Sequence, residues 1–345
     1  MKRNFINKIG FFLLVVLFFA GTHGAQAQCT AGCNSNYGLN SNNDAATIEY
    51  DNMISGNDNT IIKESDGTFK VFGYGMDNNG VSNVLSPLVI NSTNFPGLQG
   101  TVLKAAIGSG QAVVLTTQGL YAWSGLNQML STTVKSTAAM GPVTIAGSNT
   151  YGLPQGVEPG NVKSLFGTAK TLAVLTCSGE AWVLTQNASA AGAGLSTVNH
   201  TWNRVTTAEP GNPTLDNVVA LRGGANNMLA LRADGTLWTW GTYSYLGDGT
   251  AYASRNRATQ MTLPNSGGTI KMIGMTSFVG TYYVLYTDGS LYAMGDNANR
   301  QLGDWTTTVC LQTNLDNSLE SIFRFIKLLI FGLDTGFCAV SGSDF

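Results

Sequence analysis

The sequence predicts an all-β repeat protein on the basis of two glycine patterns and one strand pattern. A strand–turn–strand–glycine unit, complete between Leu229 and Gly249, recurs in weaker copies along the chain. Each copy has a turn glycine, at positions 67, 119, 179, 235 and 289, which gives a repeat of about 50 to 60 residues. A second glycine, at positions 56, 108, 167 and 224, lies 11 or 12 residues earlier. Two glycines that repeat together favour a common unit over an all-β sandwich with chance similarity between hairpins.

The complete copy reads as two strands joined by a turn. Leu229–Arg232 (LALR) has the alternation of a half-buried strand. Asp234-Gly235 supplies the two positive-φ positions of a two-residue hairpin turn. Thr236–Trp240 (TLWTW) is rich in β-branched and aromatic residues and predicts the second strand. Gly241 ends that strand, and Leu246–Gly249 (LGDG) predicts a further turn.

The repeat length predicts the architecture. Repeats of about 50 residues with about four short strands are typical of β-propeller blades, which bury their faces against neighbouring blades. Five units are recognisable, and residues 332–340 look like the start of a sixth that stops before its second strand. We therefore predict a β-propeller of four-stranded blades over residues 47–345, incomplete at its C-terminal end.

The order of residues in the repeat resembles that of the regulator-of-chromosome-condensation repeat family. The shared order is glycine, Ala-Leu, Asp-Gly, an aromatic residue, Trp-Gly and Leu-Gly-Asp-Gly, and the resemblance covers roughly residues 50–340. It implies a seven-bladed propeller. The chain departs from the family pattern because Trp-Gly occurs only at Trp240-Gly241, and because Asn227 stands near the position of the family's histidine.

Ring closure has two interpretations. A propeller closes when its last blade meets its first, so five and a half blades leave two unpaired edges. We expect the sequence to be part of a longer protein, or its last part to be altered. The alternative is a six-bladed ring in which a strand at residues 47–50 completes the last blade.

The N-terminal residues predict export. Residues 1–27 combine basic residues, an apolar run from Ile9 to Ala20 and an A-x-A cleavage site, which together indicate a signal peptide. The apolar run is too short for a stable spanning helix. A lipoprotein anchored at Cys29 is the weaker alternative, because the usual small-residue box is missing before it. We expect a secreted or cell-surface protein with no stable membrane span after signal cleavage.

Residues 28–46 form a polar, asparagine-rich leader. Cys29 and Cys33 are near enough to close a small disulfide loop, which export would permit. Cys177 and Cys338 fall on predicted inner strands, where we expect buried small hydrophobic residues rather than disulfide partners. Leu130–Gly160 and Asn187–Pro213 predict loops over one rim.

The apolar segment Leu319–Phe331 is either a linking strand or a short amphipathic helix.

Composition argues against several function classes. The formal net charge is −2 and only 11% of residues are charged, so there is no basic surface for nucleic acid. His200 is the one histidine beyond the signal peptide, and no H-E-x-x-H, paired Cys-x-x-Cys or Walker motif occurs. The oxygen-rich stretches at 76–80 and 295–300 lack the ligand spacing of an EF-hand. We expect no catalytic residues, metal or cofactor.

Aromatic residues divide into two groups. Those on predicted strands are expected in the core: Trp123, Trp182, Trp238, Trp240 and Tyr292. Those in loops after the Trp-Gly position, with nearby polar residues, are candidates for a binding surface: Tyr243, Tyr245, Tyr252, Asn297, Asn299, Arg300 and Trp305.

The family resemblance implies several activities, and the signal peptide restricts them. Nucleotide exchange and chromatin binding occur inside the cell and do not suit an exported, near-neutral chain. A secreted bacterial inhibitor of β-lactamases is similar in architecture and binds its target through one propeller face. We predict a secreted, non-enzymatic propeller that binds an extracellular protein or glycan, as part of a larger surface protein or adhesin. The alternatives are a polysaccharide-acting enzyme using Asp248 and Asp304, a secreted enzyme inhibitor and a structural spacer.

Overall fold

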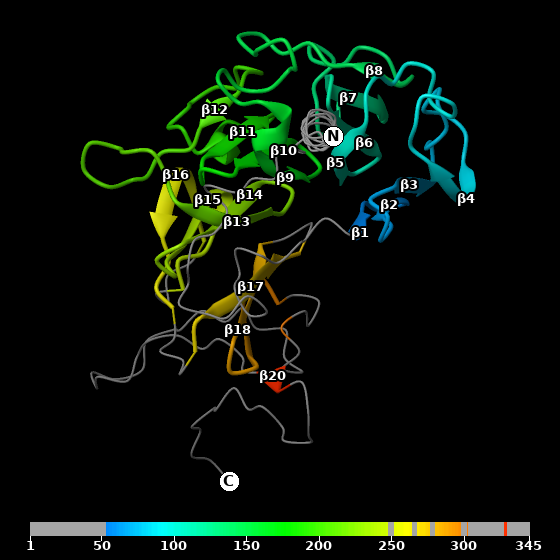
Figure 1. Ribbon diagram of the computed structural model, residues 1–345. Helices are drawn as coiled ribbons and strands as arrows, with labels where there is room; N and C mark the ends of the chain where they lie inside the picture. The colour runs from blue at the N-terminus through cyan, green and yellow to red at the C-terminus, as the bar shows by residue number, and fades with distance from the viewer. Residues whose placement is uncertain are drawn as a thin grey trace, which may run out of the picture.

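The computed structural model describes residues 53–247, 252–263, 268–276, 280–297 and 302, and the backbone of 328–329. Within them, five four-stranded antiparallel sheets follow one another along the chain (Figure 1). The blades are β1 Met53–Ser55, β2 Asn59–Lys63, β3 Phe69–Gly73 and β4 Val84–Val89; β5 Val102–Gly108, β6 Gln111–Thr116, β7 Gly119–Ser124 and β8 Gly141–Pro142; β9 Val162–Gly167, β10 Thr171–Thr176, β11 Ala181–Thr185 and β12 Asn203–Arg204; β13 Val218–Gly223, β14 Asn227–Arg232, β15 Leu237–Ser244 and β16 Ala253–Gln260; β17 Ile270–Met275, β18 Thr281–Tyr286, β19 Ser290–Gly295 and β20 Leu328–Leu329.

The first strand of each blade lies innermost. Contacts run from β1 to β5, from β5 to β9, from β9 to β13 and from β13 to β17, so the blades are arranged around a common hub. Figure 1 shows β1–β4 and β17–β20 at the two ends of this arc. The predicted all-β propeller of four-stranded blades is confirmed. The predicted strand at 47–50 and the partial unit at 332–340 lie outside the described residues.

The core consists of four apolar clusters, one between each pair of neighbouring blades. In β14, Leu229 and Leu231 pack against the fifth blade, whereas Met228 and Ala230 pack against the third. The expectation of a half-buried strand at Leu229–Arg232 is therefore wrong, because a second strand inside a propeller is covered on both faces. Its residues from Met228 to Leu231 are all fully buried.

The hairpin turns differ from the predicted two-residue turn. The turn glycine of the fourth blade, Gly235, has a φ of 83°, but Asp234 is not among the residues with positive φ. The N–H of Gly235 donates to the oxygen of Arg232 at 3.0 Å, and Asp234 Oδ1 accepts the N–H of Thr236 at 3.0 Å. An aspartate that binds the backbone two residues on stays in the ordinary φ region, so the glycine alone adopts positive φ. The same aspartate contact occurs at Asp66.

Close packing of the backbone explains the glycine at the Trp-Gly position. Gly241 has a φ of 109° and pairs with Asn227, the first residue of β14. A Cβ at Gly241 would lie 2.5 Å from the Cα of Asn227 and closer still to the oxygen of Asn226. Gly73 and Gly295 have φ values of 118° and 112° and pair with the first residues of β2 and β18. Close backbone approach therefore selects glycine here.

The two long insertions are more ordered than expected. Leu130–Gly160 contains β8, and Asn187–Pro213 contains β12 and the 3-10 helix η2 Ala188–Ala191; each supplies the outermost strand of its blade. In the segment Leu319–Phe331, the described residues Leu328–Leu329 form β20, in agreement with the strand alternative. The described part of the chain contains no helix with the length and hydropathy needed to span a lipid bilayer.

Most core expectations are confirmed. Trp123, Trp238 and Trp240 are fully buried, while Trp182 and Tyr292 are half-buried. Cys177 is buried as expected, but it is disulfide-bonded, so the expectation that it has no disulfide partner is wrong. Burial and disulfide formation do not exclude each other, since cysteine is among the residues most often buried in either state.

Candidate functional site

Three tyrosines of the fourth blade, Tyr243, Tyr245 and Tyr252, lie together where β15 ends and β16 begins. We call them the tyrosine group. The rings of Tyr243 and Tyr252 meet edge to face, with centroids 5.1 Å apart, and the ring of Tyr252 lies 5.7 Å from that of Tyr245. Tyr243 and Tyr252 are 37% and 50% exposed, whereas Tyr245 is 6% exposed. Two rings are therefore available to a partner, and the third supports them from below.

The tyrosine group rests on Tyr282, a fully buried residue of β18. The Tyr282 ring lies 6.2 Å from that of Tyr245, and its hydroxyl donates to the backbone oxygen of Tyr243 at 3.3 Å. Asn227 Nδ2 donates to the same backbone oxygen at 2.9 Å and to the Tyr282 hydroxyl at 3.2 Å. Side chains from two adjacent blades thus fix the backbone of Tyr243.

The phenol groups under this surface remain neutral. Burial raises the pKa of Tyr245 to about 12, and the negative charge of Asp296 acts in the same direction. Burial also raises the pKa of Tyr282, against the opposing effect of its hydrogen bonds with Thr239 and Asn227. Both phenols therefore stay neutral at physiological pH, and the hydroxyl of Tyr282 acts as a hydrogen-bonding support.

Asn297 does not present its side chain at the protein surface. Asn297 is fully buried, and its Oδ1 accepts the N–H of Leu302 at 2.9 Å. Its visible role is to hold the loop after β19. Three other predicted surface residues, Asn299, Arg300 and Trp305, lie outside the described residues, as do the rim carboxylates Asp248 and Asp304.

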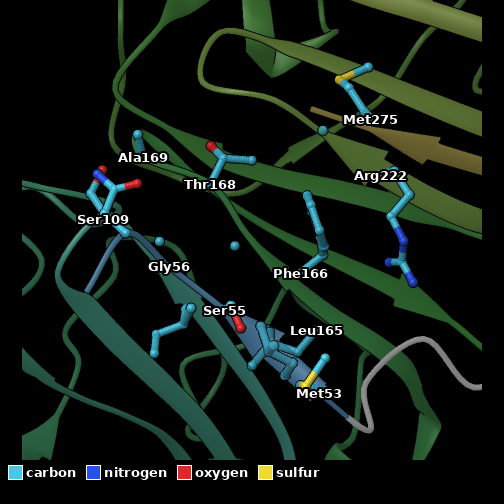
Figure 2. Close-up of a pocket in the computed structure, with 16 residues that line it drawn as sticks. Met53, Ser55, Gly56, Ser109, Leu165, Phe166, Thr168, Ala169, Arg222 and Met275 are labelled. Atoms are coloured by element: carbon cyan, nitrogen blue, oxygen red, sulfur yellow. The ribbon is translucent and has the colours of Figure 1, made fainter. Parts of the chain in front are cut away.

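A second candidate site is a cavity of about 280 Å³ at the hub, lined by residues from all five blades (Figure 2). Met53, Leu165 and Met275 contribute apolar walls, and the hydroxyls of Ser109 and Thr168 contribute polar ones. In Figure 2, Met275 lies on the opposite side of the cavity from Ser109. Sequence analysis missed this cavity, because its walls come from residues more than 200 positions apart, from Met53 to Met275.

Arg222 is the one charged side chain among the described residues that line the hub cavity. Its guanidinium carbon lies 5.3 Å from the centre of the Phe166 ring, and its Nη1 donates to the backbone oxygen of Leu221 at 2.8 Å. In each blade, one inner-strand residue pairs with the third residue of the second strand. Arg222 holds this position in the fourth blade, and the other four blades have apolar residues or glycine there: Ile54, Ala106, Phe166 and Gly274.

The chemistry of both sites suits noncovalent binding. Among the described residues, no group of three or more His, Cys, Asp or Glu side chains is placed to hold a metal ion. His200 lies half-buried in the loop before β12, with a φ of 51°. No described carboxylate is among the residues that line the hub cavity.

The five blades form a β-propeller with their first strands innermost, and in three of them a positive-φ glycine of the third strand pairs with the first residue of the second strand. The chain is similar in structure to human WBSCR16, with 19% identity, a TM-score of 0.50, and coverage of 72% of this chain and 64% of that one. It is also similar to yeast RCC1 (Prp20) in complex with Kap60, with 17% identity, a TM-score of 0.52, and coverage of 71% and 55%. The chain thus spans less than two thirds of the length of these neighbours.

No protein-family model matches the chain, and no curated protein matches it. The likeness to solved structures therefore establishes the fold.

Proposed function

We propose that this chain is a secreted, non-enzymatic interaction module that binds an extracellular protein through Tyr243 and Tyr252. The observation that carries the proposal is the pair of exposed rings held edge to face above two buried tyrosines. Tyrosine is enriched in binding hot spots because it offers a large contact area at a low cost in conformational entropy. The anchoring of the Tyr243 backbone by Asn227 and Tyr282 reduces that cost further.

A protein partner is favoured over a glycan by the geometry of the rings. Their planes are inclined by 63°, so Tyr243 and Tyr252 form a notched surface rather than one flat stacking platform. A notch with two phenol hydroxyls suits an inserted side chain and polar contacts at its rim. Binding to an extracellular glycan instead is an outcome that the experiment below distinguishes.

Two features support export. Residues 1–27 have the composition of a signal peptide. Cys177 is disulfide-bonded, and such bonds persist mainly in oxidising compartments. We therefore propose a secreted or cell-surface location, which cell fractionation tests: the chain should be recovered outside the cytoplasm and shortened at its N-terminus.

The binding proposal is tested by capture from the extracellular fraction of the source cells. The immobilised full chain is compared with the double variant Tyr243→Ser/Tyr252→Ser and with Tyr74→Ser, which alters a 64% exposed tyrosine of the first blade. We expect one protein to be retained by the wild type and by Tyr74→Ser, and to be depleted at least tenfold by the double variant. Equal retention by all three forms contradicts the proposal, and retention abolished by deglycosylation identifies a glycan ligand.

A further inference from the structure

We propose that Tyr243 and Tyr252 form a site of oxidative coupling, at which a haem peroxidase and hydrogen peroxide join the two phenol rings through a carbon–carbon bond. The coupling is a covalent change of the two side chains themselves and goes beyond the binding of a protein partner. The proposal rests on the contact between the rings, on their exposure and on the fixed backbone of Tyr243. It relies on the proposed export of the chain only for access to the oxidant.

The two rings are close enough to couple when both are oxidised. Their centroids lie 5.1 Å apart and their planes are inclined by 63°, so the edge of one ring faces the other. Exposed side chains reorient on the picosecond-to-nanosecond timescale, which lets the two ring edges meet. The Tyr243 backbone is held by hydrogen bonds of 2.9 Å from Asn227 and 3.3 Å from Tyr282. Such proximity favours reaction within the pair over reaction between molecules.

Exposure selects this pair among the tyrosine contacts of the described residues. Three other pairs of tyrosine rings are in contact, at centroid distances of 5.4 to 6.2 Å: Tyr245 with Tyr252, Tyr245 with Tyr282, and Tyr286 with Tyr292. Each of these pairs contains a ring that is at most 6% exposed. Tyr243 and Tyr252 are 37% and 50% exposed. Because coupling requires oxidation of both rings, only this pair offers two rings that the oxidant reaches.

The reaction consumes one molecule of hydrogen peroxide for each crosslink. A peroxidase that has reacted with peroxide takes one electron from each phenol, the hydroxyl proton leaves, and two phenoxyl radicals result. The radicals join at the ring carbons next to the oxygens, and the hydrogen displaced from each of these carbons returns as a proton to a phenol oxygen. The product is a biphenol that has lost two hydrogen atoms, and the peroxide is reduced to two molecules of water.

The crosslink joins the end of one strand to the start of the next. Tyr243 belongs to β15 Leu237–Ser244, and Tyr252 directly precedes β16 Ala253–Gln260. A covalent link between the two side chains closes the chain between them into a loop and reduces the number of conformations that it can adopt. Coupling should therefore slow hydrogen exchange at the amides of residues 243–247.

The experiment treats the full chain with hydrogen peroxide and a haem peroxidase, and N-acetyltyrosine serves as a separate positive control for the enzyme. We expect the blue fluorescence of a biphenol in the monomer fraction. After proteolysis of the chain between Tyr243 and Tyr252, mass spectrometry should find the two residues linked. Because coupling occurs within one molecule, the yield per chain should stay constant over an about tenfold range of protein concentration. No product, links only between molecules, or a link at other tyrosines overturns the proposal.

Single phenylalanine variants identify the two coupled residues. Tyr243→Phe and Tyr252→Phe each keep a ring on the surface and remove the phenol, and each should lower the yield to about a tenth or less. Tyr245→Phe is the matched control, because it removes a buried phenol of the same group, and it should leave the yield unchanged. An equal loss in all three variants, or full yield in Tyr252→Phe, overturns the assignment. The readout needs no partner, so it is independent of the tests of partner binding and of export.

Discussion

The Nζ of Lys163 donates a 2.8 Å hydrogen bond to the backbone oxygen of Val219, and the two residues occupy equivalent positions in adjacent blades. Each is the extra residue of a β-bulge near the start of its inner strand, in β9 and β13. Phe166 and Arg222, which stack on each other further along the same two strands, are also equivalent. The third and fourth blades are therefore joined at two points along the hub.

Lys163→Met should destabilise the propeller. The substitution removes a charge-assisted bond to a half-buried carbonyl, and we expect a loss of roughly 1–2 kcal/mol in the free energy of unfolding. Urea unfolding monitored by tryptophan fluorescence measures it as a lower midpoint at an unchanged slope. Lys271→Met is the control, because Lys271 is the bulge residue of β17 and its amine makes no hydrogen bond among the described residues. An equal loss in both variants contradicts a specific role for the Lys163–Val219 bond.

Gly241→Ala should be more damaging than an alanine at a glycine whose surroundings are open. A Cβ at Gly241 would overlap with the backbone of Asn226 and Asn227. Gly211 also has positive φ, but no atom lies within 4 Å of a Cβ built there. We expect Gly211→Ala to cost about 1 kcal/mol from backbone strain alone. Gly241→Ala should cost at least about 2 kcal/mol more because of the overlap. Similar midpoints of thermal unfolding would show that close approach does not select glycine at the Trp-Gly position.

Tyr282→Phe should loosen the support of the tyrosine group. The change removes the hydroxyl that contacts Asn227, Thr239 and the backbone of Tyr243, and it leaves buried polar groups with fewer partners. A loss of about 1–3 kcal/mol is expected. Hydrogen exchange should also become faster at the amides of residues 243–247. Tyr74→Phe, at an exposed position, should change neither quantity. Unaltered hydrogen exchange in Tyr282→Phe would show that the buried hydrogen bonds of Tyr282 do not support the backbone of the tyrosine group.

Asp77 should make the stability depend on acid pH. Burial acts to raise its pKa, but hydrogen bonds from the N–H groups of Ser82 and Val81 outweigh that effect and hold the pKa below its ordinary value. A lowered pKa in the folded state contributes stability that is fully present above the unfolded-state value of about 3.9. That contribution is lost as the pH falls through the lower, folded-state value.

Asp77→Asn should therefore be less stable than the wild type at pH 6, and the difference should shrink below pH 4. The measurement is urea unfolding of both forms between pH 3 and pH 6. A difference that stays constant over this range would show that the carboxylate charge does not act through these hydrogen bonds.

The repeat was predictable because turn and close-approach glycines are set by local backbone geometry. Four turn glycines have φ values between 81° and 85°: Gly67, Gly179, Gly235 and Gly289. Because this conformation favours glycine, the repeated turn is visible in a single sequence. The outermost strands β8 and β12 were not predictable. Each has two residues, and each is defined by pairing with its neighbour, Tyr121 with Pro142 and Trp182 with Arg204. Pairing partners in long insertions leave no periodic pattern in the sequence.

The candidate sites were likewise predictable only where they depend on residues close together in the sequence. The sequence brought Tyr243, Tyr245 and Tyr252 together because they are close along the chain, but it did not show that Tyr245 is buried against Tyr282 of the next blade. The hub cavity depends on contacts between blades and was missed. The available signal was Arg222, a charge at a position where the equivalent strands carry apolar residues or glycine.

The measurement that tests the central claim most directly is photo-crosslinking from the tyrosine group in cells that export the chain. A photoreactive p-benzoylphenylalanine replaces Tyr252 in one variant and Tyr74, the exposed tyrosine of the first blade, in another. The account predicts a discrete crosslinked protein from position 252 and none from position 74. Crosslinks of equal yield from both positions, or none from position 252, would contradict a binding surface at Tyr243 and Tyr252.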